Sequence, residues 1–282
     1  MNCSLLKGKR GIIFGALDEN SLAWKVALRA NEEGAIFTLS NAPVALRMGE
    51  INKLAEITKS QVIAADVTQV SELEDLVTES MKILGGKIDF ILHSVGMSPN
   101  VRKGLHYTEL NYDYYFKTLD VSAISLHKLL AVAKKMDAIS QGGSVVALSY
   151  IAASRTFSSY SDMSQAKAML ESIVRSFGYH YGISHGVRIN SVSQSPTFTT
   201  AGNGVANIKA FYNYSDAMSP LGNADGESCA DLCIALFSDL TRKVTMQNIY
   251  NDGGFSTMGM SNKLIEQYKT VPEDLINMEP TQ

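Results

Sequence analysis

The chain is poor in cysteine and has no excess of positive charge. Its 282 residues include three cysteines, Cys3, Cys229 and Cys233, which are too few and too unevenly spaced for a disulfide framework. None of them stands in the paired Cys-x2-Cys and His spacing of a metal site. Lys and Arg number 25 against 28 Asp and Glu, a net charge of −3 that argues against a dedicated nucleic-acid binder. We therefore expect neither a metal nor a nucleic-acid partner.

Long hydrophobic runs are absent as well. No apolar stretch approaches the roughly 18–20 residues that cross a membrane, and the first residues lack the apolar segment of a signal peptide. We expect a cytoplasmic protein without membrane insertion, in which Cys229 and Cys233, four apart in an apolar helical pattern, serve packing alone. Six prolines, 45% hydrophobic and 19% charged residues are typical of a folded globular chain.

Short apolar runs alternate with longer amphipathic ones along the chain. The short runs are apolar nearly throughout, which is typical of strands covered on both faces of a parallel sheet. We expect strands at 10–15, 35–40, 61–65, 88–93, 144–149, 187–192 and 247–251. We expect helices at 21–33, 44–58, 71–83, 112–136, 160–181 and 225–239. This alternation predicts an α/β fold, in which residues 1–282 form a single Rossmann-like, doubly wound domain with a seven-stranded parallel sheet flanked by helices.

One segment, 194–218, fits neither period because it mixes Thr, Gly, Asn and aromatic residues. A long irregular insert in a compact domain is usually a lid or a binding loop, with a plain surface excursion as the alternative. We expect a substrate-covering lid at about 195–218.

The turn after the first strand has features of a phosphate-binding turn, although it is not a G-x-G-x-x-G motif. Gly15 lets the chain leave the strand without a Cβ in the way. Ser21 stands where the next helix begins, and either caps that helix or faces a phosphate. Asp18 and Glu19 oppose anion binding unless they point away from the site.

The other strand ends carry polar residues without a cation. The second strand ends at Ser40-Asn41-Ala42, which offers no Arg for a 2′-phosphate, and this favours NADH over NADPH without excluding NADPH. Asp66, after the third strand, either accepts a hydrogen bond from an adenine amino group or caps a turn. His93, on the fourth strand, is more often a core histidine than a ligand.

Tyr160 and Lys167 stand seven residues apart after the fifth strand. On a helix, seven residues turn through about 700° and rise ~10.5 Å, so the two side chains share one face. Alone, the pair is weak, because one lysine on a helix is normally solvated. At the carboxyl edge of a dinucleotide-binding sheet it indicates a catalytic site.

Four motifs together resemble one family. They are Gly15-x5-Ser21-x-Ala23, His93-Ser94-x-Gly96, Ser149-Tyr150-x9-Tyr160-x6-Lys167 and the glycine-rich 251–255. From about residue 6 to residue 260, the chain resembles the bacterial NADH-dependent enoyl-acyl-carrier-protein reductases of the short-chain dehydrogenase/reductase superfamily. The Tyr-x6-Lys spacing is the most specific element, since most of that superfamily carries Tyr-x3-Lys.

The resemblance implies roles for individual residues. Tyr160 would donate a hydrogen bond to the thioester carbonyl, Lys167 would hold the nicotinamide ribose, and Tyr150 would line the acyl pocket. Met97 and Ser98 would lie beside the substrate. The remaining cofactor contacts would come from Gly15, Ser21, Leu22, Asp66, Val67, Ser94, Val95, Pro196, Thr197 and Thr199. Ser195 and Phe198 depart from the family's usual glycine and basic residue at those positions.

The resemblance also implies partners and a reaction. The expected reaction is reduction of the 2-enoyl thioester of an acyl-carrier protein by NADH, in a homotetramer. An acidic carrier calls for basic contacts, for which the sequence offers Arg102, Lys103, Lys128, Lys134, Lys135 and Lys209. Two alternatives stay open: a reductase of another enone or carbonyl substrate, and a non-catalytic dinucleotide-binding protein.

Overall fold

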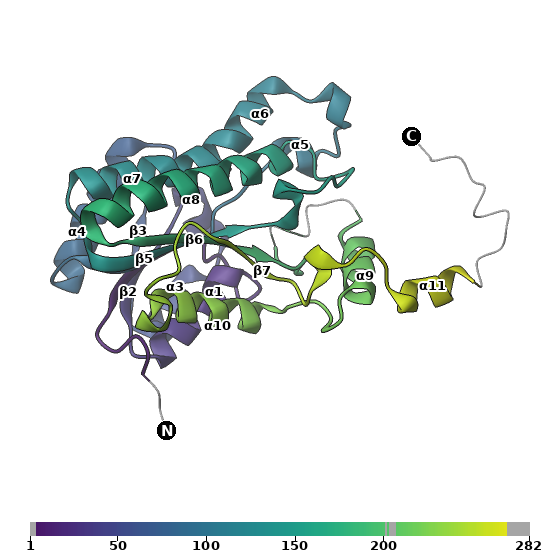
Figure 1. The fold of residues 1–282 in the computed structure, drawn as a ribbon. Coiled ribbons are helices and arrows are strands. Elements are labelled where there is room, and N and C mark those ends of the chain that lie inside the picture. The colour runs from purple at the N-terminus through teal and green to yellow at the C-terminus, as the bar shows by residue number, and fades with distance from the viewer. Residues whose placement is uncertain (1–3, 201, 203–206, 270–282) are drawn as a thin grey trace.

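Seven parallel strands form one sheet in a computed structural model that describes residues 4–200, 202 and 207–269. The strand order is β3-β2-β1-β4-β5-β6-β7, so the connection from β3 to β4 crosses back over β1 and β2 (Figure 1). The order confirms the doubly wound arrangement predicted from the alternating pattern. The strands are β1 (Arg10–Phe14), β2 (Ile36–Asn41), β3 (Gln61–Ala64), β4 (Ile88–His93), β5 (Ile139–Ser149), β6 (Arg188–Gln194) and β7 (Asn248–Asn251).

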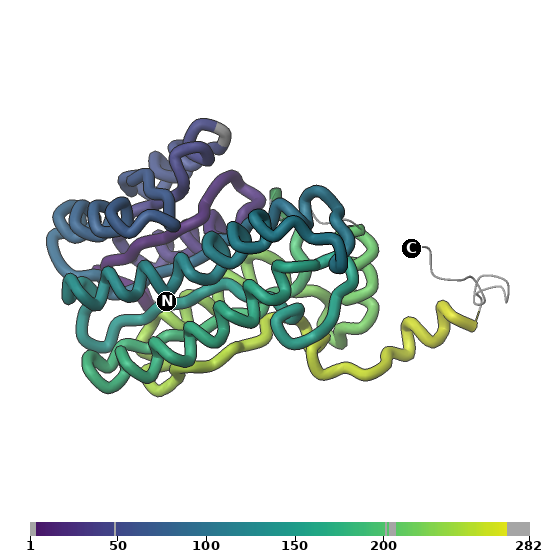
Figure 2. Tube along the Cα trace, turned by 90° about the horizontal axis from the view of Figure 1, so that it is seen from above, coloured from purple at the N-terminus to yellow at the C-terminus, as the bar shows by residue number. Residues whose placement is uncertain are grey.

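Helices cover both faces of the sheet (Figures 1 and 2). On one face lie α4 (Val70–Leu84), α7 (Ser125–Lys135) and α8 (Met163–His185), and on the other α1 (Leu22–Glu32), α3 (Ile51–Thr58) and α10 (Gly226–Phe237). The short α2 (Pro43–Met48), α5 (Pro99–Arg102), α6 (Tyr112–Leu119), α9 (Ile208–Met218) and α11 (Asn262–Tyr268) complete the described set. Figure 1 shows α9 beside the end of β7, where the strands finish.

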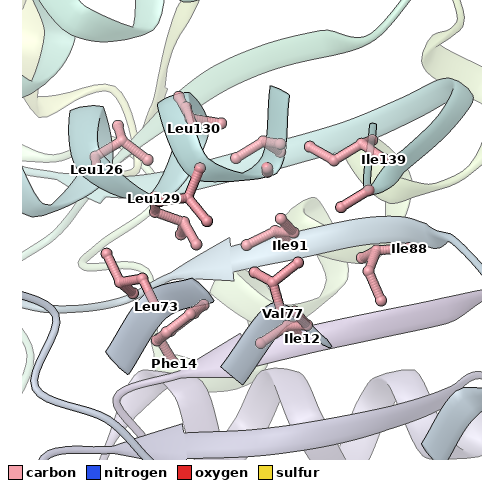
Figure 3. Close-up of a cluster of buried hydrophobic side chains, with 14 of the residues drawn as sticks. Ile12, Phe14, Leu73, Val77, Ile88, Ile91, Leu126, Leu129, Leu130 and Ile139 are labelled. Carbon is pink, nitrogen blue, oxygen red and sulfur yellow. The ribbon is translucent and has the colours of Figure 1, made fainter. Parts of the chain in front are cut away.

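The sheet separates two hydrophobic clusters. Figure 3 shows one of them, in which Ile12 and Ile91 of the sheet meet Val77 of α4 and Leu129 of α7. On the opposite face Trp24 of α1 packs among buried residues that include Cys229 and Cys233 of α10. These two cysteines therefore serve packing, as expected, while Cys3 lies outside the described residues. In the part of the chain described, no helix is both long and apolar enough to cross a bilayer, and no cluster of metal-ligating side chains occurs.

The helix expected over 44–58 is broken into α2 and α3 at Gly49 and Glu50. The backbone amide of Glu50 donates to the carbonyl of Leu17 at 2.7 Å. A Cβ on Gly49 would lie 2.6 Å from the backbone carbonyl oxygen of Leu17, so a larger residue would force the two backbones apart. The break therefore comes from a contact with the turn after β1, which helical periodicity does not reveal.

The helix expected over 112–136 contains a π-helical turn at Asp120–Ile124, between α6 and α7. Such turns often occur at functional sites. Here it brings the Ser122 hydroxyl to the backbone of Met97, accepting from its amide at 2.9 Å and lying 3.2 Å from its carbonyl oxygen. The turn thus fixes a residue predicted to lie beside the substrate.

The prediction that Tyr160 lies on a helix is wrong. Helix α8 begins at Met163, and Ser161 has a left-handed φ of 45°, which interrupts helical backbone before it. The helix instead runs on to His185 and ends at Gly186, whose φ of 62° is typical of a glycine C-terminal cap. Tyr160 therefore stands in the turn before α8, and its proximity to Lys167 has another origin than a shared helical face.

The segment expected to be irregular, 194–218, is helical in its second half, since α9 spans Ile208–Met218. The Thr- and Gly-containing sequence between β6 and α9 lacks the apolar spacing of a helix. Of the lid predicted at about 195–218, residues 201 and 203–206 lie outside the described residues. The remaining part flanks the carboxyl edge of the sheet.

Candidate active site

One large cavity, of about 1150 Å³, opens along the carboxyl ends of β1 to β6. It lies where β1 and β4 run side by side, the switch point at which open α/β sheets bind their ligands. Every residue that the sequence analysis assigned to the site lines this cavity: Gly15, Ser21, Leu22, Asp66, Val67, Ser94, Val95, Met97, Ser98, Tyr150, Tyr160, Lys167, Pro196, Thr197 and Thr199. The fold thus gathers them in one place, while their individual roles stay predictions.

Gly15 forms the closest approach in the cavity wall. Its φ is 94°, and a Cβ built on it would lie 1.9 Å from the carbonyl oxygen of Ser94. The backbone at Gly15, where the chain leaves β1, therefore packs directly against the end of β4. Because Gly15 has no side chain, none projects from this point into the cavity. A flat, extended ligand such as a dinucleotide fits a wall of this kind.

Gly15→Ala is expected to destabilise the protein and to weaken dinucleotide binding more than tenfold, because the new methyl collides with the Ser94 backbone. Gly8→Ala is the matched control, since Gly8 also has positive φ, 73°, but nothing lies within 4 Å of a built Cβ. Thermal unfolding and NADH titration compare the two. Equal effects of both substitutions would mean that the close approach to Ser94 is unimportant.

Ser21 does not cap α1 with its side chain. Its hydroxyl donates to the Asp18 carbonyl at 2.7 Å and accepts from the Leu17 amide at 3.1 Å, so it shapes the turn. Asp18 and Glu19 do not line the cavity: Asp18 accepts from Thr200 at 2.5 Å, and Glu19 pairs with Lys53. Both carboxylates are therefore engaged by other side chains, and the Thr200 that binds Asp18 itself lines the cavity.

The part of the cavity beside the ends of β2 and β3 is polar, and none of the described lining residues that follow these strands is a Lys or Arg. The Ser40 hydroxyl is buried without a hydrogen-bond partner, and Asn41 donates its amide to the Ala16 carbonyl at 2.9 Å. Asp66 accepts from the Thr68 amide and hydroxyl, at 2.9 and 2.7 Å, which is the turn-capping alternative. The capping oxygen of Asp66 is therefore occupied, so its predicted contact to adenine depends on the other carboxylate oxygen.

Lys167 projects from the second turn of α8 into the cavity, with 8% of its surface exposed. Its Nζ donates to the Leu148 carbonyl at 2.8 Å, at the end of β5. Burial lowers the pKa of this lysine to about 8, although the carboxylate of Glu171 opposes the shift. The ammonium is thus held at a fixed point with further donors available to a ligand.

The rings of Tyr160 and Tyr150 lie side by side in the same cavity, with their centroids 5.0 Å apart and their planes tilted by 51°. Burial raises the pKa of the Tyr160 phenol well above its usual range. The pKa of Tyr150 is raised mainly by burial and, to a lesser extent, by the neighbouring Tyr160. Desolvation therefore favours the neutral form of the Tyr160 phenol. Among the described residues the Tyr160 hydroxyl has no hydrogen-bond partner, so it is a protonated donor facing the cavity.

Phe157 and Phe211 form an aromatic wall of the cavity that no sequence pattern indicated. The Phe157 ring lies 5.4 Å from that of Tyr150 and 6.0 Å from that of Phe211, which belongs to α9. Both phenylalanines line the cavity. Their apolar faces suit an acyl chain, and only the position of α9 could have revealed the pair.

His93 is a core residue, as expected. It is fully buried, and its Nε2 lies 2.9 Å from the Ser125 hydroxyl. Burial, assisted by the Lys167 charge, lowers the pKa of His93 to about 3, so the ring stays neutral.

The fold and the cavity define a class: an α/β dinucleotide-dependent oxidoreductase with a partly buried tyrosine and a buried lysine at the carboxyl edge of its sheet. Residues 15–256 match the family model described as Enoyl-(Acyl carrier protein) reductase. The chain therefore belongs to the enoyl-acyl-carrier-protein reductase family, which confirms the resemblance seen in the motifs.

Relatives and solved structures agree with this placement. The enoyl-acyl-carrier-protein reductase (NADH) 2 of Rhizobium meliloti is 32% identical over 260 residues, which are 91% of this chain and 94% of that protein. The enoyl-acyl-carrier-protein reductase (NADH) FabI of Bacillus cereus is 30% identical over 258 residues, which are 90% of this chain and 99% of that protein. The crystal structure of the FabI–NADH complex from Alistipes finegoldii is 60% identical, has a TM-score of 0.93, and covers 96% of this chain and 94% of that one.

Proposed function

We propose that this protein uses NADH to reduce the carbon–carbon double bond of trans-2-enoyl thioesters carried by an acyl-carrier protein, a step of fatty-acid elongation. The observation that carries the proposal is the pairing of a protonated, unpartnered Tyr160 hydroxyl with the Lys167 ammonium in one cavity. A dinucleotide-binding module without chemistry needs no phenol at that place.

The residues divide the chemistry between them. A nicotinamide bound along this cavity would supply a hydride to the β-carbon of the enoyl thioester, and the α-carbon would take its proton from solvent, directly or relayed through the ribose hydroxyl. Negative charge then develops on the thioester oxygen, and the Tyr160 O–H donates a hydrogen bond to it. Lys167 presents its remaining N–H donors to the ribose hydroxyls while Leu148 holds its position. Tyr150, Phe157 and Phe211 exclude water around the reacting carbons, which strengthens the hydrogen bond from Tyr160.

The test is to follow NADH oxidation with crotonyl and longer 2-enoyl thioesters, linked to acyl-carrier protein or to coenzyme A, beside a panel of ketones. We expect turnover on the enoyl thioesters and none on the ketones. Turnover on ketones alone would make the protein a carbonyl reductase, and dinucleotide binding without any turnover would make it a binding protein.

We assign the carrier contact to cations at the rim of the cavity. Arg102 is exposed, lines the cavity and has no partner among the described residues, and the same holds for Lys117 of α6. The other basic candidates are engaged or stand elsewhere: Lys103 binds Tyr114, Lys128 binds Asp120, Lys134 binds Ser184 and Lys135 binds Glu74. Lys209 lies on α9. A lower KM for carrier-linked than for coenzyme A thioesters, lost at high salt, would support this contact.

We propose a homotetramer in the cytoplasm. The outward side of α8 exposes Met169, Tyr179 and Ile183, an apolar surface suited to a second copy. Sedimentation equilibrium measures the assembly, and a monomer at micromolar concentration would contradict it.

Ala42→Arg is expected to raise the kcat/KM for NADPH relative to NADH more than tenfold. Ala42 lines the cavity directly after β2 and before α2, where dinucleotide folds that accept a 2′-phosphate carry a cation. Arg47 lies in the next helix but does not line the cavity. Arg47→Ala is the control and should leave the cofactor ratio unchanged. An unaltered ratio in Ala42→Arg would place the adenosine ribose elsewhere.

A further inference from the structure

Asp162 is a fully buried carboxylate beside the site and belongs to none of the motifs above. Its Oδ1 accepts from the Ser98 hydroxyl at 2.6 Å. Its Oδ2 accepts from the Asn100 amide at 2.7 Å and from the Thr118 hydroxyl at 2.9 Å. Three hydrogen bonds thus compensate the desolvation of one buried charge.

The carboxylate joins three segments that are far apart in the sequence. Asp162 stands between Tyr160 and the start of α8, Ser98 caps α5 by accepting from the Val101 amide at 3.0 Å, and Thr118 belongs to α6. Figure 1 shows α5 and α6 close together, and α6 also contacts α8. Asn100 extends the connection, since it exchanges two hydrogen bonds with the backbone of Asn111, both at 3.2 Å.

The turn that carries Tyr160 has few other side-chain anchors. Ser161 has left-handed backbone, with φ at 45°, and its buried hydroxyl has no partner. Asp162 occupies the position of an N-terminal cap, yet its side chain bonds no amide of α8 and turns inward instead. The inward carboxylate therefore holds this strained turn against the walls of the cavity.

We propose that Asp162 is a positioning residue for the reaction: it fixes the Tyr160 hydroxyl relative to the substrate wall formed by Met97 and Ser98. The Ser98 hydroxyl is consumed by Asp162 and by the Val101 amide, so Ser98 acts on the substrate through its backbone position. A shift of this turn by about 1 Å would misplace the donor and reduce turnover on the order of 10²-fold. The inference rests on the proposed enoyl reduction.

The central experiment is Asp162→Asn, which keeps the volume but turns one acceptor oxygen into an N–H donor facing Asn100. We expect kcat for enoyl thioesters to fall about 10- to 100-fold. The NADH dissociation constant should stay within about twofold, because the Lys167 contact to Leu148 lies outside this network. A loss confined to NADH affinity, or an unchanged kcat, would overturn the proposal.

The double variant Asp162→Asn/Asn100→Asp tests whether the hydrogen bond between residues 162 and 100 positions the turn. It exchanges amide and carboxylate, so the new amide at 162 again meets an acceptor, and Thr118 can accept from it while donating to the Tyr114 carbonyl, 2.8 Å away. We expect at least a fivefold recovery of kcat over the single variant. Recovery stays partial because an Asp at 100 faces the Asn111 carbonyl. No recovery would mean that charge at 162, and not its hydrogen bonds, matters.

The matched control is Asp252→Asn. Asp252 is also buried, and its carboxylate accepts two backbone amides, from Gly254 at 3.0 Å and Ser256 at 2.9 Å. Neither of these residues lines the cavity, whereas Asp162 bonds Ser98, which does. It should lower the melting temperature and leave kcat within threefold. An equal loss of kcat in this control would reduce Asp162 to a purely structural role.

Hydrogen–deuterium exchange keeps the test independent of the reaction assignment. Amides at 160–163 should exchange faster in Asp162→Asn and return toward the wild-type rate in the double variant. If the wild type reduces no enoyl thioester, the proposed function fails. The exchange rates at 160–163 still show whether Asp162 holds the turn in place. If Asp162→Asn does not fold, Thr118→Val removes one donor alone, and we expect from it a several-fold lower kcat with unchanged NADH affinity; an unchanged kcat would overturn the proposal.

Discussion

Tyr160→Phe is expected to lower kcat for enoyl thioesters by about 10²–10³-fold, the usual loss when one preorganised donor to a developing oxyanion is removed. The phenol is partly buried beside Tyr150 and is held protonated, because desolvation raises its pKa. The NADH dissociation constant should change less than about twofold, since the hydroxyl acts on the thioester oxygen and not on the dinucleotide. Stopped-flow single turnovers and NADH titration measure the two quantities.

Tyr181→Phe is the matched control for this substitution. Tyr181 is 1% exposed, its hydroxyl likewise has no hydrogen-bond partner, and its pKa is also raised by burial. It lies on α8 away from the cavity, so its loss should leave kcat unchanged. A reduction of less than a few-fold in Tyr160→Phe would remove the phenol from the mechanism even if the reaction is right.

Lys167→Met is expected to raise the NADH dissociation constant more than tenfold and to lower turnover, while it stabilises the protein at pH 7. The folded pKa of about 8 lies below the usual lysine value of 10.5, so the charged lysine opposes folding. Below pH 8 this penalty is fully present, and it disappears as the pH rises from 8 to 10.5 because the unfolded chain then binds more protons. Removing the charge should therefore add on the order of 1–3 kcal/mol at pH 7, after the lost bond to Leu148 is counted.

The same pKa predicts how cofactor binding depends on pH. In the wild type, NADH affinity should fall as the pH rises through about 8, where Lys167 loses its proton and one of its donors. Chemical denaturation and NADH titration between pH 6.5 and about pH 9.5 follow stability and affinity together. Lys134→Met, at an exposed lysine bound to Ser184, should change neither. Destabilisation by Lys167→Met at pH 7 would contradict the buried-charge argument.

The strands and the position of the site could be predicted because both depend on local pattern. Apolar runs predicted all seven strands, although β5 begins at Ile139 and not at 144. Parallel strands bring their carboxyl ends to one edge, so residues that follow the strand ends, such as Gly15 and Ser94, had to meet. The family followed from motifs such as Tyr160-x6-Lys167, and the expected preference for NADH followed from the absence of an Arg after the second strand.

The helix boundaries failed where a distant contact competes with helical periodicity. Leu17 breaks the helix at Gly49, and the inward turn of Asp162 delays α8 to Met163. The directions of Asp18 and Glu19 were likewise set by partners on other elements, Thr200 and Lys53. No propensity of the residues themselves carries this information.

The sequence by itself determined the sheet, the edge where its ligand site forms, and the residues gathered there, because side-chain period and turn chemistry are local properties. The tertiary structure alone decided that Tyr160 precedes its helix and that Asp162 anchors it. The partners of Asp162 lie 64, 62 and 44 residues away, so their hydrogen bonds exist only after the chain has folded. Packing also shields Tyr160 and Lys167 from water. That desolvation raises the pKa of the tyrosine and lowers the pKa of the lysine.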